Sequence, residues 1–139
     1  VSRLVNMGIE PYTVAQTTTG VVAQRLMRKI CPHCKAKETL SQEVLGQLGI
    51  TKTDTDINTY RSTGCAKCNH TGYKGRVAIY EILPCTEKIQ QIIVDGATAQ
   101  DIKAAARISG MRTLRESAIE KMLNGITTKE EVERCTTPD

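Results

Sequence analysis

The fold of this chain depends on two short stretches, Cys31-Pro32-His33-Cys34 and Cys65-Ala66-Lys67-Cys68. Each stretch holds two thiols so close in sequence that one tight turn can present both sulfur atoms to a single ion. Two such turns facing each other complete the tetrahedral set of sulfur ligands that is typical of a closed structural zinc site. The predicted metal ligands are Cys31, Cys34, Cys65 and Cys68.

The predicted site favours a structural metal, because its four protein ligands leave no open position for a substrate. Zinc is the expected ion, and iron in a rubredoxin-like site is the alternative, since tetrahedral thiolates accept either. A redox-active site is the less favoured interpretation, because it would need only one Cys-x-x-Cys motif, placed near a βαβ unit. His33 and His70 flank the motifs and could each replace a ligand. Because four cysteines already fill the shell, we expect both to be loop histidines.

Composition points to a globular chain. Of its 139 residues, 40% are hydrophobic and 24% are charged, which is usual for such proteins. No apolar run approaches the roughly 18 residues of a membrane span. The first residues lack the features of a secretory signal and are typical of the middle of a helix, so we expect a piece of a longer protein. Cys85 and Cys135 are expected to be free thiols in a reducing compartment, with disulfides as the alternative.

Periodicity predicts a mixed α+β chain. A helix should end near Gly8, and residues 14–22 should be partly helical. Residues 24–30, where basic residues alternate with Leu26 and Ile30, are predicted to form a strand or a strand–helix junction. A strand is predicted at 76–83 from its β-branched and apolar residues. Between them, Ser41 should cap a short helix, followed by a loop or short strand over residues 51–63.

The last third of the chain predicts helices. Thr98 with Asp101, and Thr128 with Glu131, fit helix-capping patterns. Apolar stripes indicate the buried positions Ile89, Ile92, Ile93, Ile102, Ala105, Leu114, Ala118 and Met122. We expect residues 86–136 to pack as one unit on the strand at 76–83. The loop between the cysteine pairs has too few apolar residues to bury a core of its own, so removing the metal should loosen residues 31–68 and leave the last helices largely formed.

Basic residues gather at both cysteine pairs. They are Arg25, Arg28, Lys29, Lys35, Lys37, Lys67, Lys74 and Arg76. One interpretation is that they offset the negative charge of a zinc ion held by thiolates. A nucleic-acid patch is a second, weakened because only Tyr73 is close enough to stack on bases. A solvated face is the third.

Several longer runs resemble the C-terminal part of type II secretion and type IV pilus assembly ATPases (general secretion pathway protein E and pilus extension ATPases). The runs are Gly20-Val21-Val22-Ala23-Gln24-Arg25-Leu26, Gly64-Cys65-Ala66-Lys67-Cys68, Thr71-Gly72-Tyr73-Lys74-Gly75-Arg76-Val77-Ala78-Ile79-Tyr80-Glu81 and Gly110-Met111-Arg112-Thr113-Leu114-Arg115-Glu116. The resemblance covers essentially the whole chain. It implies the tail of a RecA-like P-loop ATPase domain at 1–30. A tetracysteine zinc-binding subdomain at 31–74 would be inserted between two strands, and 75–139 would form a strand plus a small helical array.

In that family the full protein is a cytosolic homo-hexamer that hydrolyses ATP with Mg²⁺ against an inner-membrane platform protein. The resemblance therefore implies a cytoplasmic location beside the inner membrane, without membrane insertion or nucleic acid. This chain has no G-x-x-x-x-G-K-[ST] motif to cradle phosphates, so we assign no catalytic residue and no role to Gln24 or Arg25. The fragment alone is expected to be inactive. Pilus assembly and secretion both stay open, and an independent zinc-ribbon-like nucleic-acid-binding module is the alternative function.

Overall fold

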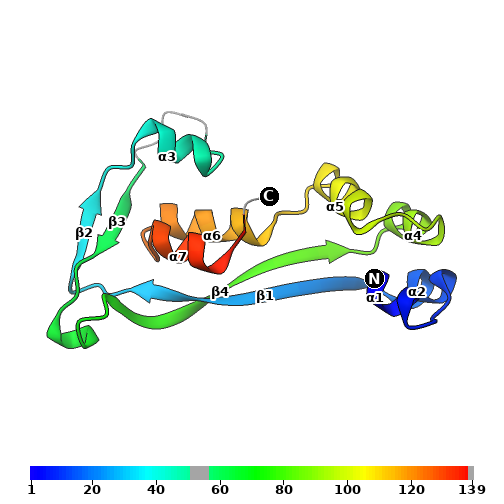
Figure 1. Cartoon of the computed structure of the whole chain (residues 1–139), viewed down its shortest axis with the longest axis horizontal. Coiled ribbons are helices and arrows are strands. Elements are labelled where there is room, and N and C mark those ends of the chain that lie inside the picture. Colours follow the sequence, from blue (N-terminus) through cyan, green and yellow to red (C-terminus); the bar gives the residue numbers. More distant parts are fainter. Residues whose placement is uncertain (51–56, 138–139) are drawn as a thin grey trace. The chain divides into compact units, whose positions relative to one another are not determined.

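The computed structural model describes residues 1–50 and 57–137, and within them the chain has seven α-helices and two small antiparallel sheets (Figure 1). The mixed α+β class predicted from the sequence is confirmed. The chain forms two compact units. Unit 1 comprises Val1–Ala23 and Tyr80–Thr113, and unit 2 comprises Gln24–Ile79 and Leu114–Asp139.

The elements follow one another along the chain with short connections. The helices are α1 (Ser2–Asn6), α2 (Pro11–Thr17), α3 (Gln42–Gln47), α4 (Glu87–Val94), α5 (Ala99–Ile108), α6 (Leu114–Leu123) and α7 (Lys129–Cys135). The strands are β1 (Gly20–Ile30), β2 (Lys35–Glu38), β3 (Thr59–Ser62) and β4 (Tyr73–Pro84), and a single 3₁₀ turn, η1, spans Ala66–Cys68.

Two strand pairs carry the cysteine motifs. β1 pairs with β4, and both strands start earlier than the sequence predicted, at Gly20 and Tyr73. Residues 14–22, expected to be partly helical, are helical up to Thr17, where α2 ends. The chain is extended from Gly20 onward, where β-branched valines favour a strand. β2 pairs antiparallel with β3, with Lys35 opposite Ser62. The structure does not describe residues 51–56, so that part of the predicted loop lies outside the described residues.

Unit 1 has a core made by α2, α4 and α5. The buried side chains are Val14, Ala15, Cys85, Ile89, Ile93, Ile102 and Ala106. The predicted burial of Ile89, Ile93 and Ile102 is confirmed, whereas Ile92 and Ala105 are only partly buried. α4 packs on both α2 and α5. The isoleucine stripe of α4 is therefore covered largely by the N-terminal helix α2.

Unit 2 has a separate core built around α6 and α7. The buried side chains are Met27, Leu48, Ile79, Ala118, Ile119, Met122, Val132 and Cys135. The expectation that residues 86–136 form one helical unit is wrong: α4 and α5 belong to unit 1, and α6 and α7 belong to unit 2. The physical reason is that each helix pair has its own partner stripe, on α2 in one unit and on strand residues Met27 and Ile79 in the other.

Local capping follows the sequence closely. Ser41 accepts a hydrogen bond from the Val44 N–H at the start of α3. Thr98 and Asp101 satisfy each other's backbone N–H groups at the start of α5. Thr128 accepts from the Glu131 N–H at the start of α7. Among the described residues, none of the helices combines the length and apolar character needed to cross a membrane.

Candidate metal centre

The four cysteines of the two motifs come together in unit 2. Their sulfur atoms all lie within 4.8 Å of one another. Adjacent Sγ atoms are 4.0 Å apart for Cys31 and Cys65, 3.8 Å for Cys34 and Cys68, and 3.7 Å for Cys65 and Cys68. A disulfide would need about 2.05 Å. Zinc–sulfur bonds of about 2.3 Å in a tetrahedron place neighbouring sulfurs about 3.8 Å apart, so the donor set fits a tetrahedral metal ion.

Backbone hydrogen bonds hold the two turns against each other. The Cys31 N–H, directly after β1, donates to the carbonyl oxygen of Gly72 at 2.9 Å. The Gly72 N–H donates in turn to the Cys68 sulfur at 3.2 Å, and the Cys65 N–H donates to the same sulfur at 3.2 Å. The first turn is therefore tied to the second through Gly72, and one sulfur receives two backbone donors, as suits a thiolate.

Two glycines permit this close approach. Gly64 has φ of +83°, and a Cβ there would lie 2.7 Å from the carbonyl oxygen of His70. Gly72 has φ of +78°, and a Cβ there would lie 2.5 Å from the Ser62 Cβ. A side chain at either position would meet both an unfavourable backbone conformation and a steric clash. The glycines before and after the second cysteine pair are therefore part of the architecture of the site.

The pKa values of two cluster thiols, Cys68 and Cys34, are shifted in opposite directions. Burial acts to raise the pKa of Cys68, but the backbone N–H groups of Cys65 and Gly72 and the adjacent thiols outweigh it and lower this pKa to about 6. Burial and hydrogen bonds to the other three thiols raise the pKa of Cys34 to about 11. Crowded sulfurs resist ionising together without a cation, and a bound divalent ion removes that penalty.

The histidines beside the cysteines do not join the cluster. Across residues 1–50 and 57–137, the four cysteines are the only group of three or more His, Cys, Asp or Glu side chains that could hold a metal ion. His33 and His70 are exposed, and His70 adopts a positive φ of 59° in the turn after Cys68.

The two remaining cysteines lie apart from the cluster. Cys85 is buried in the core of unit 1, and Cys135 is buried in the core of unit 2. Both are free thiols, and burial raises the pKa of each. Neither has the lowered pKa or the accessibility of a reactive cysteine.

Unit 2 also contains a buried carboxylate that sequence reasoning missed. The Glu131 side chain is fully buried. Its oxygens accept hydrogen bonds from the Arg28 guanidinium at 2.8 and 3.0 Å and from the Arg28 backbone N–H at 2.7 Å. Arg134 donates two more, at 2.6 and 2.8 Å. Burial acts to raise the pKa of Glu131, but the Arg134 and Arg28 hydrogen bonds outweigh it and lower the pKa to about 2.

The sequence offers only a weak signal for this pocket. Thr128 followed by Glu131 is a capping pattern, which normally leaves the glutamate at the surface. Arg134 lies one turn later, which favours a local ion pair. Nothing marks Arg28, which is 103 residues away. In one of the three interpretations of the basic cluster, Arg28 would offset the negative charge of zinc held by four thiolates, and the structure instead pairs it with Glu131.

Both tyrosines near the cysteines are already engaged. The Arg28 guanidinium stacks 4.1 Å from the centre of the Tyr73 ring, and the Tyr73 hydroxyl hydrogen-bonds the Thr128 hydroxyl at 2.8 Å. The Lys35 ammonium lies 4.5 Å from the centre of the Tyr60 ring. These contacts hold the rings against the protein itself.

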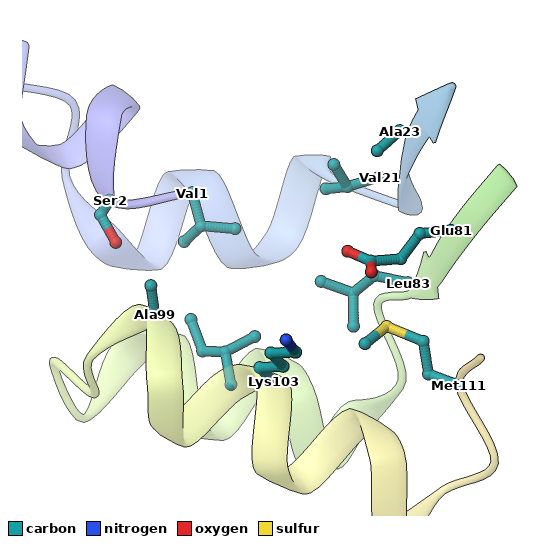
Figure 2. Close-up of a pocket in the computed structure, with 10 residues that line it drawn as sticks. Val1, Ser2, Val21, Ala23, Glu81, Leu83, Ala99, Lys103 and Met111 are labelled. Atoms are coloured by element: carbon teal, nitrogen blue, oxygen red, sulfur yellow. The ribbon is translucent and has the colours of Figure 1, made fainter. Parts of the chain in front are cut away.

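Unit 1 contains a pocket of about 250 Å³ that the sequence did not predict. Figure 2 shows side chains of α5 facing those of β1 and β4 across it, with Glu81 and Lys103 as its charged members. The rest of the lining is largely apolar: Val1, Ser2, Val21, Ala23, Leu83, Ala99, Ile102 and Met111. No thiol or histidine lines it, so it is unrelated to the metal centre.

Comparison with known proteins gives a consistent result. Residues 1–134 match the family described as Type II/IV secretion system protein. The chain is 44% identical, over 95% of its length, to the type IV pilus assembly ATPase PilB of Thermus thermophilus. It is 43% identical, over its full length, to PilB of Myxococcus xanthus, and 39% identical, over 98% of its length, to the type II secretion system ATPase E of Vibrio cholerae.

The match is to one part of much longer proteins. The chain spans 15%, 25% and 27% of the length of these three relatives, respectively. Within the chain, the match includes both cysteine pairs and both units, and it extends through nearly all of α7. This chain therefore belongs to the family of type II/IV secretion system proteins.

Proposed function

We propose that this chain is the C-terminal metal-binding and helical region of a hexameric cytosolic ATPase that drives type IV pilus assembly or type II secretion. The observation that carries the proposal is the match over residues 1–134 to a family whose similar members are named as ATPases of these two machines. ATP and Mg²⁺ would act elsewhere in the parent protein. The role of this region would be structural, with contacts to partners of the machine.

The proposed cofactor of the region is one Zn²⁺ per chain, held by Cys31, Cys34, Cys65 and Cys68. The spacing of the sulfurs and the two N–H donors on Cys68 support it. Four thiolates around a zinc ion leave no position for a substrate, so the ion would have a structural role rather than a catalytic one. It would stabilise the fold of unit 2. Elemental analysis of chain prepared without chelator should find about one zinc per molecule, and Cys34→Ser should lose it. Bound iron in place of zinc, or no metal, would contradict this assignment.

The proposed organisation of the parent protein follows the same resemblance. Residues 1–30 would be the tail of its RecA-like ATPase domain, 31–74 the zinc-binding subdomain, and 75–139 a strand with the helical array. The full protein would hydrolyse ATP, and this chain would supply no catalytic residue because it lacks a phosphate-cradling loop. Its place would be cytoplasmic, peripheral to the inner membrane through its partners.

The proposed partner contact uses a basic surface of unit 2. Residues 28–37 and 59–76 hold eight Lys or Arg and no Asp or Glu, although the whole chain has 19 basic and 15 acidic residues. Seven of these cations are exposed: Lys29, Lys35, Lys37, Arg61, Lys67, Lys74 and Arg76. The two stretches themselves contain no acidic residue that could pair with them. An acidic region of the inner-membrane platform protein would complement this surface.

A nucleic-acid-binding module remains the second candidate, because the same basic surface would attract phosphates. The rings of Tyr60 and Tyr73 argue against it, since a cation of the protein itself already lies over each ring. Binding of this chain to single- and double-stranded DNA and RNA should be absent even at low salt. Binding at low salt that weakens steeply with added salt would favour this second candidate.

A further inference from the structure

Tyr73 lies between the four-cysteine cluster and α7, the last helix of unit 2. Its backbone follows Gly72, whose N–H donates to the Cys68 sulfur and whose carbonyl accepts from the Cys31 N–H. Its hydroxyl reaches Thr128, the residue that caps α7, at 2.8 Å. Tyr73 therefore touches the structure that holds the sulfurs at one end and the start of α7 at the other.

The same side chain also supports the Glu131 pocket. The Arg28 guanidinium stacks on the Tyr73 ring while it binds the Glu131 carboxylate. The Thr128 hydroxyl that contacts Tyr73 also accepts the Glu131 N–H. Moving the Tyr73 ring would thus disturb both the cap of α7 and one of the two cations that neutralise its buried carboxylate. A buried carboxylate that loses a cationic partner is costly.

The segment before α7 binds β1 just ahead of the first cysteine. The Ile30 N–H donates to the Ile126 carbonyl, and the Thr127 hydroxyl donates to the Arg28 carbonyl, both at 2.9 Å. These bonds dock the segment whether or not Tyr73 is in place. What Tyr73 adds is a direct hydrogen bond from the segment that follows the second cysteine pair to the cap of α7.

We propose that Tyr73 is a positioning residue that couples metal binding by the four cysteines to the docking of α7. This inference rests on the proposed function of the cysteines as a zinc site. When the cysteines hold zinc, Gly72 is fixed and Tyr73 is held against Thr128 and Arg28. When zinc is removed, the turn around Gly72 relaxes and α7 loses that restraint. This differs from the expectation that metal removal leaves the last helices largely formed.

The test is hydrogen–deuterium exchange of the 139-residue chain, measured with zinc bound and after removal of zinc by a chelator under reducing conditions. The quantity compared is the ratio of the stripped to the loaded exchange rate of the α7 amides, residues 129–135. Tyr73→Phe removes only the hydroxyl and leaves the ring. Tyr60→Phe is the matched control, because its ring also carries a cation, while among the described residues its hydroxyl has no hydrogen bond to α7.

We expect zinc removal to speed exchange in α7 of the unaltered chain. In Tyr73→Phe the ratio should fall by about two- to tenfold, the effect of losing one net hydrogen bond, while Tyr60→Phe should keep the unaltered ratio. A tyrosine with a merely structural role would speed α7 exchange equally in the loaded and stripped states. In that case the ratio would not change, and the proposal would be overturned.

Two further measurements, the exchange of the α6 amides and the zinc content, distinguish the ways in which the proposal can fail. The α6 amides lie in the same core, so equal acceleration of α6 and α7 would mean that zinc loss opens the whole unit, which overturns a link specific to α7. Zinc content is measured on every sample. Zinc bound with α7 unaffected by its removal overturns the coupling alone, whereas no zinc in any sample overturns the proposed zinc site and the coupling with it.

Discussion

The Glu131 side chain is a buried charge whose ionisation the surrounding residues enforce. Its pKa lies below the ordinary value of 4.5, at about 2. The folded chain therefore binds this proton more weakly than the unfolded chain does, and the resulting stability is fully present above about pH 5. It is lost as the pH falls toward 2. Since both arginine partners are about half exposed, we expect a loss of about 1 to 3 kcal/mol at low salt.

This pH dependence can be separated from acid release of metal. Urea unfolding of unit 2 between pH 6 and pH 3 should be compared for the unaltered chain and for Glu131→Gln, both without zinc. The glutamine variant should be less stable at pH 6 and should lose less stability on acidification, because it has no charge to neutralise. Equal slopes for the two proteins would mean that Glu131 does not titrate as described.

Gly64 offers a second test at the scale of one residue. Gly64→Ala should destabilise unit 2 by about 2 kcal/mol, because the new Cβ would require a left-handed backbone and would meet the His70 carbonyl. Gly46→Ala is the matched control, since Gly46 lies in α3 and a methyl group added there would meet nothing within 4 Å. The control should gain about 0.5 to 1 kcal/mol. Urea midpoints would show the contrast, and similar values for the two variants would contradict it.

Prediction from sequence worked for residues whose chemistry is local. The cysteine pairs and the capping threonines were found because their function depends on neighbours a few residues away. Glu131 was missed because its partner Arg28 comes from a distant strand. Its burial depends on the tertiary fold, and a glutamate three residues after a capping threonine has the same local pattern whether it is buried or exposed.

Among the secondary-structure elements, α6 illustrates how packing sets the energy of a substitution. Met122 is fully buried in the core of unit 2, whereas Leu114, at the start of the same helix, is only partly buried. Met122→Ala should therefore cost about 2 to 5 kcal/mol. Leu114→Ala, for which the sequence predicted full burial, should cost about 1 to 2 kcal/mol. Thermal unfolding of the two variants would measure this order, and a larger loss for Leu114→Ala would contradict the packing described.

Which helices would form was predicted better than which helices would pack together. Helix ends follow from caps and glycines, which the chain displays directly: α4 ends before Gly96, and α5 begins after Thr98. The pairing of α4 with α2 was not predicted, because any apolar stripe can cover any other of similar width. Strands β2 and β3 were also weak in sequence, being four residues each and largely polar.

In the molecule as a whole, the two units should respond differently to metal. All four cysteines of the cluster belong to unit 2, and none belongs to unit 1. A ligand that binds only the folded state stabilises the part that holds it. Calorimetry should therefore show two transitions, of which a chelator lowers only one. Ile93→Ala, in the core of unit 1, should lower the other. A chelator that shifts both transitions equally would contradict the independence of the two cores.

The long sequence separation within the Glu131 pocket has a consequence for synthesis on the ribosome. Arg28 and Glu131 are 103 residues apart, and at about 5 to 20 residues per second the ribosome makes Arg28 roughly 5 to 20 seconds before Glu131. All four thiols emerge during that interval, whereas α7 is still unmade. A metal ion bound as proposed could therefore be taken up by the nascent chain well before the last helix closes over β1, while the core of unit 2 still lacks the side chains of α7.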